Sequence, residues 1–557
     1  MSAAIPSVAP TPRGAVNAAR RGPVRATIIM TARERYGLTE SAIESIVRNT
    51  NCGYRLIFAD GQAPEPVRRR LEARADEWNL ELVRVDAALW PNQIRRQLVA
   101  QVDTDYIVFI DNDVHVEAGW LETLIACADE TGAGVVGPLY LIGDGKSPPR
   151  VHMAGGDTVR RETATGTVLE ETHRHLNADP ALVTGSLARR ECDFVEYHCL
   201  LVRGDLVRDG AAFDPDIVCV HEHIDLSLAA KQRGYATISE PKARVTYLGL
   251  AEWSCDEVAF RRRRWSWDAA QASIAAFCRK WWIADDERSF GPVRKFLRIH
   301  IASVDPFRAG VMGDAELAQP MAPHDVPQSR SALLDLALAR GCQTHELAFL
   351  AQIYQLAATL MDGGYRPCGR PFINHLVGTA GVLAYYGFRL EVVAAGLLHA
   401  AYSHCPPLPT GPRASIDMVC AALGGRDTTL ESRVRAYTRR GMDLSALAGA
   451  GGTGASLSVA DGEIVAIAAA NEIDMLVSGE FRYSGRGDAL KPPAIALIDH
   501  VCGVLGVPGL AATLRIARAA YSLAPPEVLT GIGGSYRIAG YNLVPMNNDA
   551  FFQLEQG

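Results

Sequence analysis

Two aspartates separated by one residue, Asp111 and Asp113, are the side chains in this sequence best placed to do chemistry. They follow Tyr106–Ile110, a short apolar and aromatic run that is typical of a buried parallel strand. At the carboxyl edge of an α/β sheet, paired carboxylates can hold a divalent cation that neutralises a pyrophosphate. The alternative is a polar turn before a helix that begins near Gly119, because D-x-D is a short pattern that often occurs by chance.

Length and composition limit the classes of protein that remain. A chain of 557 residues is several times the usual domain size and predicts two or more domains. The formal net charge of -7 argues against nucleic acid as a partner. The twelve cysteines include no C-x-x-C pair, which favours reduced thiols. No apolar run approaches the roughly 18 to 20 residues of a membrane span, so we expect a cytoplasmic protein.

The elements that position the aspartates alternate along the chain. We expect strands at Ala26–Met30, Tyr54–Ala59, Leu80–Val85 and Tyr106–Ile110, and helices at about Thr39–Arg48, Pro64–Trp78 and Pro91–Gln101. This alternation predicts βαβ units and a parallel sheet, to which residues 135–141 add another strand.

The stretch Gly143–Thr184 is rich in Gly, Pro and Thr and lacks a sustained period, which predicts a loop-rich insert. It contains His152, His173 and His175. Their spacing matches no metal motif, so solvated side chains are favoured over a zinc site.

The order of motifs resembles the family-2 glycosyltransferases, which have the nucleotide-sugar-binding glycosyltransferase A fold. The matching motifs are IIMTARER, LIFADG, PNQIRRQLVAQV, DTDYIVFIDND and, at 221–235, HEHIDLSLAAKQRGY. The resemblance covers Val24 to about Asp285. It implies an α/β fold with a mostly parallel sheet. It also implies a metal-dependent, inverting transfer of a sugar from a nucleoside-diphosphate sugar to an acceptor hydroxyl. UDP-sugar is the expected donor, and the sequence does not identify the acceptor.

By this resemblance, Thr31 and Asp60 lie near the base and ribose of the donor. A carboxylate can accept hydrogen bonds from either, although Asp60 could also be an ordinary turn residue before Gly61. Arg95 matches the helix arginine of the family. The asparagine that usually follows it is here Arg96, which replaces an amide contact and could add a phosphate contact.

The resemblance also assigns the two aspartates. Asp111 would face the ribose and the metal, and Asp113 would bind Mn²⁺ or Mg²⁺ directly, as suits a hard cation with oxygen ligands. Some related enzymes use a histidine near this motif as a ligand. His115 could do so, or it could point to solvent or pack as a neutral ring.

The catalytic base is expected in the 221–235 motif, where the family has a Glu-Asp pair and this chain has Glu222-His223. An inverting transfer needs one base to remove the proton of the acceptor hydroxyl. Glu222 is the candidate; His223 could share that role, approach the metal or orient Glu222. Asp225 is better explained as a helix N-cap or a structural acid.

The segment Phe260–Trp282 interleaves arginines with tryptophans. Such a surface can contact an anionic membrane peripherally or stack on carbohydrate. However, its FCRKWW run resembles the closing helix of the same family, which favours packing against the catalytic core.

A second, all-α domain is predicted from Ser331 onward by leucines at helical spacing. Residues 370–405 resemble the metal-dependent His-Asp phosphohydrolases, with His375 and His399 as the two histidines. The paired Asp is missing because Ala400 follows His399, so the resemblance is to a degenerate member. His375, His399, His404 and Asp474 could still gather one metal ion, although a scaffold or a ligand-sensing, dimerising module is favoured.

The predicted organisation is a disordered tail at 1–22, a glycosyltransferase domain at 23–285, a linker at 286–330, a helical domain at 331–525 and an irregular tail at 526–557. A second class of function stays open. In it the first domain only binds a nucleotide, and the helical domain is regulatory or hydrolytic.

Overall fold

The computed structural model describes residues 23–33, 35–61, 63–85, 89–251, 253–304, 314–366, 368–404, 413–423, 428–441, 444, 447, 457–480 and 490–521. The expected tails at 1–22 and 526–557 lie outside these residues. The chain divides into two compact units. The first comprises the residues up to Trp253 together with Phe260–Ser303, and the second comprises Ser254–Ala259 together with the residues from Val304 onward.

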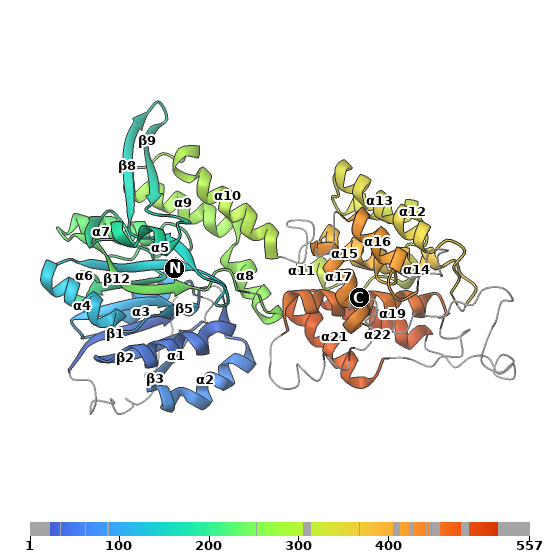
Figure 1. Ribbon diagram of the computed structural model, residues 1–557, viewed down its shortest axis with the longest axis horizontal. Helices are drawn as coiled ribbons and strands as arrows, with labels where there is room; N and C mark the ends of the chain where they lie inside the picture. The colour runs from blue at the N-terminus through green and yellow to red at the C-terminus, as the bar shows by residue number, and fades with distance from the viewer. Residues whose placement is uncertain are drawn as a thin grey trace, which may run out of the picture. The chain divides into compact units, whose positions relative to one another are not determined.

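A ten-stranded sheet organises the first unit (Figure 1). Its main order is β10 (Arg190–Cys192), β12 (Thr237–Tyr247), β6 (Val135–Ile142), β11 (Cys199–Arg203), β4 (Tyr106–Asp111), β1 (Val24–Thr31), β2 (Gly53–Asp60) and β3 (Leu80–Arg84). In addition, β5 (Val114–Val116) pairs with β12, and β7 (Arg150–Met153) pairs with β6. The strands predicted up to Asp111 are confirmed.

The sheet is mixed. The pairs β1–β2, β1–β4 and β2–β3 are parallel, as the alternation of strands and helices predicts. Beyond β4, however, β11 runs antiparallel to both β4 and β6, and β10 runs antiparallel to β12. The expectation of a mostly parallel sheet therefore holds for the first half of the unit and needs correction for the second, where only β6 and β12 pair in parallel among the pairs described. The residues between β6 and β11, all of which the structure describes, form β7, the β8–β9 hairpin and short helical turns, and they contain no long crossover helix of the kind that usually connects parallel neighbours.

The order of the strands reverses between β1 and β4. Strands β1, β2 and β3 are neighbours in that order, toward one edge of the sheet. Helix α3 (Pro91–Val99) then leads the chain to β4, on the other side of β1. In the register, Thr31 lies opposite Asp111 on one side and Ala59 on the other. Strand ends at such a switch point form the crevice in which α/β sheets bind ligands. The other helices used below are α1 (Thr39–Asn49), α2 (Glu65–Trp78), α4 (Trp120–Thr131) and α7 (Glu222–Gln232).

The insert between β6 and β11 is more regular than the sequence indicates. In it, β7 joins the main sheet, while β8 (Gly156–Thr163) and β9 (Gly166–His173) form an antiparallel hairpin that projects from the sheet (Figure 1). The expectation of a loop-rich segment is wrong here. Most side chains of the hairpin are exposed or half-buried, so no alternation of apolar and polar residues marks its strands.

Two helices, α9 (Trp267–Trp281) and α10 (Glu287–Val304), close the first unit. Trp281 of α9 and Leu297 of α10 belong to the same buried cluster as the strands. Packing against the core is thus confirmed for Trp281 of the FCRKWW run, whereas Trp282 is 79% exposed. The segment expected to be a linker from residue 286 begins instead as a packed helix, because α10 contributes apolar side chains to that core.

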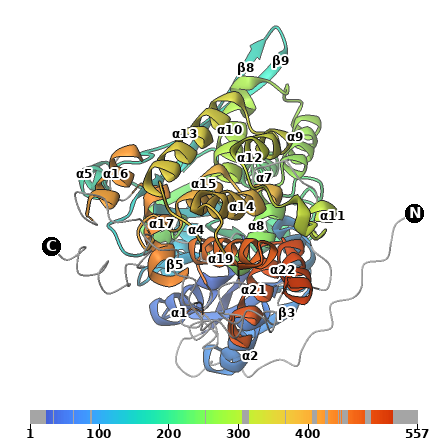
Figure 2. The same ribbon diagram turned by 90° about the vertical axis from the view of Figure 1, so that its right-hand side faces the viewer.

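The second unit is helical in the residues that the structure describes. Its longer helices are α12 (Arg330–Ala339), α13 (Thr344–Leu360), α14 (Phe372–Tyr385), α15 (Leu390–Leu398), α16 (Arg413–Ala422), α17 (Thr429–Ala436), α19 (Val459–Val477), α21 (Pro492–Val504) and α22 (Pro508–Tyr521). Within this unit α14 packs on α15 and α19, and α19 packs on α22 (Figure 2). Among the described helices of the whole chain, none is long and apolar enough to cross a membrane.

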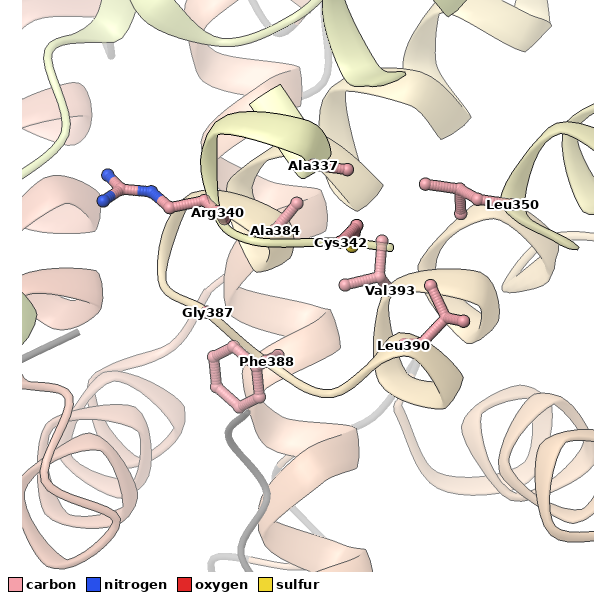
Figure 3. A pocket seen from close by; sticks show the side chains of 9 residues that line it. All are labelled: Ala337, Arg340, Cys342, Leu350, Ala384, Gly387, Phe388, Leu390 and Val393. Carbon is pink, nitrogen blue, oxygen red and sulfur yellow. The ribbon is translucent and has the colours of Figure 1, made fainter. Parts of the chain in front are cut away.

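A small apolar pocket lies where α12 to α15 meet, and Leu350 and Val393 face into it (Figure 3). Cys342 and Phe388 complete its wall, together with Ala337, Arg340, Ala384, Gly387 and Leu390.

Of the residues predicted to bind a metal in the helical unit, His375 and Asp474 form an ion pair with each other. Asp474 Oδ2 lies 2.7 Å from His375 Nδ1, and the Asp474 carboxylate also forms an ion pair with Arg370. His399 Nδ1 donates instead to the carbonyl of Gly396, at 2.7 Å. Within the described residues, His375, His399, His404 and Asp474 do not bring three donor atoms within 4.8 Å of one another.

Candidate active site

Arg95 joins the carboxyl ends of β1 and β4. Its Nη2 lies 3.3 Å from Thr31 Oγ1 and 3.3 Å from Asp111 Oδ1. Its guanidinium lies 3.8 Å from the centroid of the Tyr197 ring. All four side chains are fully buried. Burial lowers the pKa of Arg95 and the Asp111 charge opposes this shift, so the guanidinium stays a cation. The structure thus brings Thr31, Arg95 and Asp111 together, although they are far apart in sequence.

The other carboxylate oxygen of Asp111 faces two groups that sequence reasoning did not single out. Oδ2 lies 3.1 Å from His198 Nδ1 and 3.6 Å from Arg33 Nε. The His198 ring stacks on Tyr247, with ring centroids 4.0 Å apart. Nothing local in the sequence marks either residue, because His198 reaches Asp111 only through the pairing of β4 with β11.

Asn112 and Asp113 form the turn that follows β4. The Asn112 side chain donates to the Arg35 carbonyl at 2.7 Å and accepts from the Arg33 backbone N–H at 3.1 Å. The Asp113 carbonyl accepts from the backbone N–H of Leu248 at 2.9 Å. Asn112 and Asp113 are both fully buried, so this turn is tied to the segments that follow β1 and β12 and is not a solvated surface turn.

Asp60, Arg96 and His115 have local roles in the structure. Asp60, at the end of β2, is buried, and its Oδ1 accepts from the backbone N–H of Ala63 at 2.6 Å, as a turn aspartate does. Arg96 is exposed. His115 Nε2 lies 3.0 Å from Ser41 Oγ of α1, and burial lowers the pKa of the His115 ring. These contacts agree with the reading of His115 as a packed neutral ring.

Glu222 and His223 begin α7 and face different partners. Glu222 Oε1 lies 3.9 Å from Arg264 Nη2, and Glu222 is buried. Burial alone would raise the pKa of Glu222, but Arg264 and neighbouring cations outweigh it and lower that pKa, so the side chain is a carboxylate. His223 Nε2 lies 3.7 Å from Glu196 Oε1.

Asp225 is a structural acid. Its Oδ1 accepts from Trp281 Nε1 at 2.8 Å and lies 2.7 Å from Lys280 Nζ. It is not the N-cap of α7, because that position belongs to His221, which has a left-handed φ of 63°. Burial raises the pKa of the Asp225 carboxyl.

Glu196 lies among histidines, which the sequence did not indicate. Each of His152, His173 and Glu196 offers one possible ligand atom, and these three atoms lie within 4.8 Å of one another. Burial lowers the pKa of His152 to about 3, so its ring is neutral. The expectation of solvated histidines is wrong for His152 and His173, because β7 and β9 carry them to the residues before β11. No spacing along the chain could have signalled a group built from three separate segments.

Residues 27–191 match the family model described as Glycosyl transferase family 2. The N-terminal part of the chain is therefore a family-2 glycosyltransferase domain. No curated protein matches the chain.

Several solved structures are similar to this chain. The crystal structure of GalNAc-T7 with UDP, GalNAc and Mn²⁺ is 14% identical with a TM-score of 0.33, and the match covers 40% of this chain and 43% of that one. This chain therefore spans less than half the length of that protein. The structure of S. aureus TarS 1-349 in complex with UDP-GlcNAc is 14% identical with a TM-score of 0.29, and covers 67% of this chain and 90% of that one.

Proposed function

We propose that the protein is a metal-dependent, inverting glycosyltransferase that moves a sugar from a nucleoside-diphosphate sugar to an acceptor hydroxyl. UDP-sugar is the favoured donor. The observation that supports this proposal most is the register that sets Thr31 beside Asp111 at the switch point of the sheet, with Arg95 joining the two side chains. This arrangement collects polar groups where α/β sheets bind nucleotides.

The donor site in this proposal is built on Asp111 and Asp113. Their carboxylates match the oxygen ligands that Mn²⁺ and Mg²⁺ prefer. Because the oxygens of Asp111 already face Arg95 and His198, Asp113 is the direct ligand and Asp111 faces the ribose and the cation. When bound, the cation would stabilise the charge that develops on the departing diphosphate.

The nucleoside would lie along the neighbouring strand ends. Thr31 ends β1 and Asp60 ends β2, one strand further from Asp111. A threonine hydroxyl and a carboxylate can both bond to base imides and ribose hydroxyls.

Glu222 is the proposed general base, and His223 is its alternative. An ionised carboxylate can take the proton of the acceptor hydroxyl as that oxygen attacks the anomeric carbon. Glu222 is ionised because nearby cations lower its pKa. His223 faces Glu196, so its ring is held by a separate group of side chains.

The helical unit is proposed as an accessory domain, with assembly into a homo-oligomer as a candidate role. Two observations argue against phosphohydrolase chemistry there. Ala400 supplies no ligand, and Arg370 already pairs with the Asp474 carboxylate that a metal would need.

The first prediction tests the donor site. Asp113→Ala should weaken the Mn²⁺-dependent binding of UDP by at least about 100-fold, because the direct ligand of the cation is lost. Isothermal titration calorimetry with UDP and Mn²⁺ measures this affinity, and the melting temperature reports whether the fold is kept. The control is Asp103→Ala, which removes an exposed carboxylate before β4 and should bind as wild type does. Equal affinities in the two variants would refute the assignment.

A further inference from the structure

The strand-rich insert carries a group of side chains that the proposed transfer does not use. His152 lies on β7, His173 ends β9, and Glu196 lies between β10 and β11. Their donor atoms all lie within 4.8 Å of one another, and His173 Nε2 is 3.8 Å from Glu196 Oε1. Backbone hydrogen bonds already hold the three segments side by side: the Ala154 N–H donates to the Arg174 carbonyl at 3.1 Å, and the Gly156 N–H donates to the Phe194 carbonyl at 3.0 Å.

Glu196 is a buried carboxylate whose Oε1 lies near the imidazole nitrogens of His173 and His223. His223 Nε2 lies 3.7 Å from Glu196 Oε1, and that nitrogen is buried without a hydrogen-bond partner. On another side, the His152 ring lies against His173 and His198, with centroids 5.6 Å and 5.4 Å away. A buried carboxylate surrounded by ring nitrogens is well balanced by a cation held between them.

We infer that His152, His173 and Glu196 bind a divalent transition-metal ion of the zinc class, at a site separate from the Asp111 and Asp113 carboxylates. Two imidazoles and one carboxylate suit zinc, whereas Mn²⁺ and Mg²⁺ prefer oxygen ligands alone. Bonds of about 2.0 to 2.2 Å would set tetrahedral ligand atoms about 3.3 to 3.6 Å apart. The 3.8 Å between His173 Nε2 and Glu196 Oε1 is close to this range, and the 4.8 Å bound on the whole group leaves a closure of at most about 1.5 Å.

The ion would add a side-chain link between the base of the β8–β9 hairpin and the residues before β11, beside the backbone hydrogen bonds already there. It would fix Glu196 and, two residues on, His198, whose Nδ1 lies 3.1 Å from Asp111 Oδ2. This metal therefore has a structural role, in contrast to the cation proposed for the donor.

The test is zinc binding to the full-length protein after removal of metal with a chelator. Calorimetry with Zn²⁺ should give one tight site per chain, and it should persist in Asp113→Asn. His173→Asn should weaken this site by more than about 100-fold, since a ligand is lost and not merely an outer-shell contact. His175→Asn is the matched control, because His175 lies two residues away, outside the group, in a left-handed conformation that asparagine tolerates.

Substitution by Co²⁺ gives a readout that needs no variant. The wild type should show the visible absorption of a tetrahedral site without the thiolate charge-transfer bands of cysteine ligation. If His173→Asn does not fold, Glu196→Gln, which keeps the shape of the side chain, takes its place. Absence of the tetrahedral spectrum, zinc binding that survives both variants, or zinc binding that is lost in Asp113→Asn would each overturn the inference. UDP and Mn²⁺ binding, measured in the same variants, separates this result from a failure of the proposed transferase site.

Discussion

Arg95 is the residue on which the geometry of the donor-side carboxylate depends. A fully buried guanidinium is costly unless its charge is matched. Arg95 meets this condition through Asp111, Thr31 and the face of Tyr197. Breaking a buried pair of this kind typically costs about 3 to 5 kcal/mol, because the remaining charge is left without a partner. The Asp111 carboxylate is therefore held in place before any donor arrives.

At the same scale, Glu222→Gln should lower turnover by about 10² to 10⁴ while donor affinity is kept. Glutamine preserves the size and hydrogen bonding of the side chain but cannot accept the acceptor proton. Steady-state release of UDP, measured with a donor and acceptor pair found by screening, gives the rate. Nuclear magnetic resonance of the wild-type product should show inverted anomeric configuration.

His223→Ala is the companion variant. If it abolishes turnover while Glu222→Gln stays nearly as active as wild type, the base is the histidine and not the glutamate. A product with retained configuration would reject the direct displacement itself.

Sequence reasoning could predict those site residues whose place depends on strand ends. Asp111 and Thr31 close predicted strands, and the carboxyl ends of adjacent parallel strands must meet. It could not predict that His198 and Glu196 lie at the site. Their positions depend on β11 running antiparallel to β4 and β6, and the sequence pattern does not fix that direction. The roles of these residues in catalysis stay predictions.

Among the elements, α9 shows how a basic, tryptophan-rich segment can serve as internal structure. Trp281 lies 4% exposed and donates to Asp225 of α7. In the preceding helix α8 (Val258–Arg264), Arg264 donates to the Cys219 carbonyl at 2.7 Å, and Arg261 donates to the His300 carbonyl at 2.6 Å. These side chains turn inward and link the closing helices to the residues that begin α7.

The link between α7 and α9 makes a stability prediction. Asp225→Ala should destabilise the first unit by about 2 to 4 kcal/mol, because Trp281 Nε1 loses its acceptor and Lys280 loses a partly buried partner. Urea unfolding followed by tryptophan fluorescence measures the change. The control Asp268→Ala removes an exposed carboxylate from the first turn of α9 and should cost no more than about 1 kcal/mol. Equal effects in the two variants would show that the buried link contributes little.

Elements whose apolar residues recur at the spacing of a strand or a helix were predictable from the sequence, and elements without such a pattern were not. The strands β1 to β4 are short buried runs, and α1 to α3 carry amphipathic patterns, so their positions follow from the sequence. The β8–β9 hairpin has largely exposed faces and so lacks an alternating pattern. The packed helix α10 contains Pro292, a residue that argues against a helix interior when only the sequence is known.

At the scale of the whole molecule, the two compact units are not two successive pieces of the chain. Ser254–Ala259 belongs to the helical unit although the first unit resumes at Phe260. The Cys255 backbone N–H donates to the Leu457 carbonyl at 2.8 Å, and Ser254 forms a β-bridge with Ser458. A Cβ atom at Gly462 would lie 2.4 Å from Cys255 Sγ, so a larger residue there would force the Cys255 side chain to move.

A truncation series tests this organisation. A protein ending at Ser303 should keep donor-dependent UDP release per folded molecule, because every proposed transferase residue and all of α10 up to that point are retained. A protein ending at Asp286 should be far less stable, because it lacks Phe290 and Leu297 of the core. Thermal unfolding and size-exclusion chromatography compare the two. Turnover that is lost in the Ser303 protein despite a folded first unit would assign the helical unit a direct part in catalysis.

Because Ser254–Ala259 belongs to the helical unit, this segment is synthesised long before the residues that it pairs with. Ser254 and its partner Ser458 are 458 − 254 = 204 residues apart. At about 5 to 20 residues per second, the partner is synthesised about 10 to 40 s after Ser254. The strands and α9 can fold during that interval. Cys255 stays exposed until α19, which packs against it, has been synthesised. A nascent chain stalled before residue 458 should thus present this cysteine to thiol reagents, and release of the full chain should withdraw it.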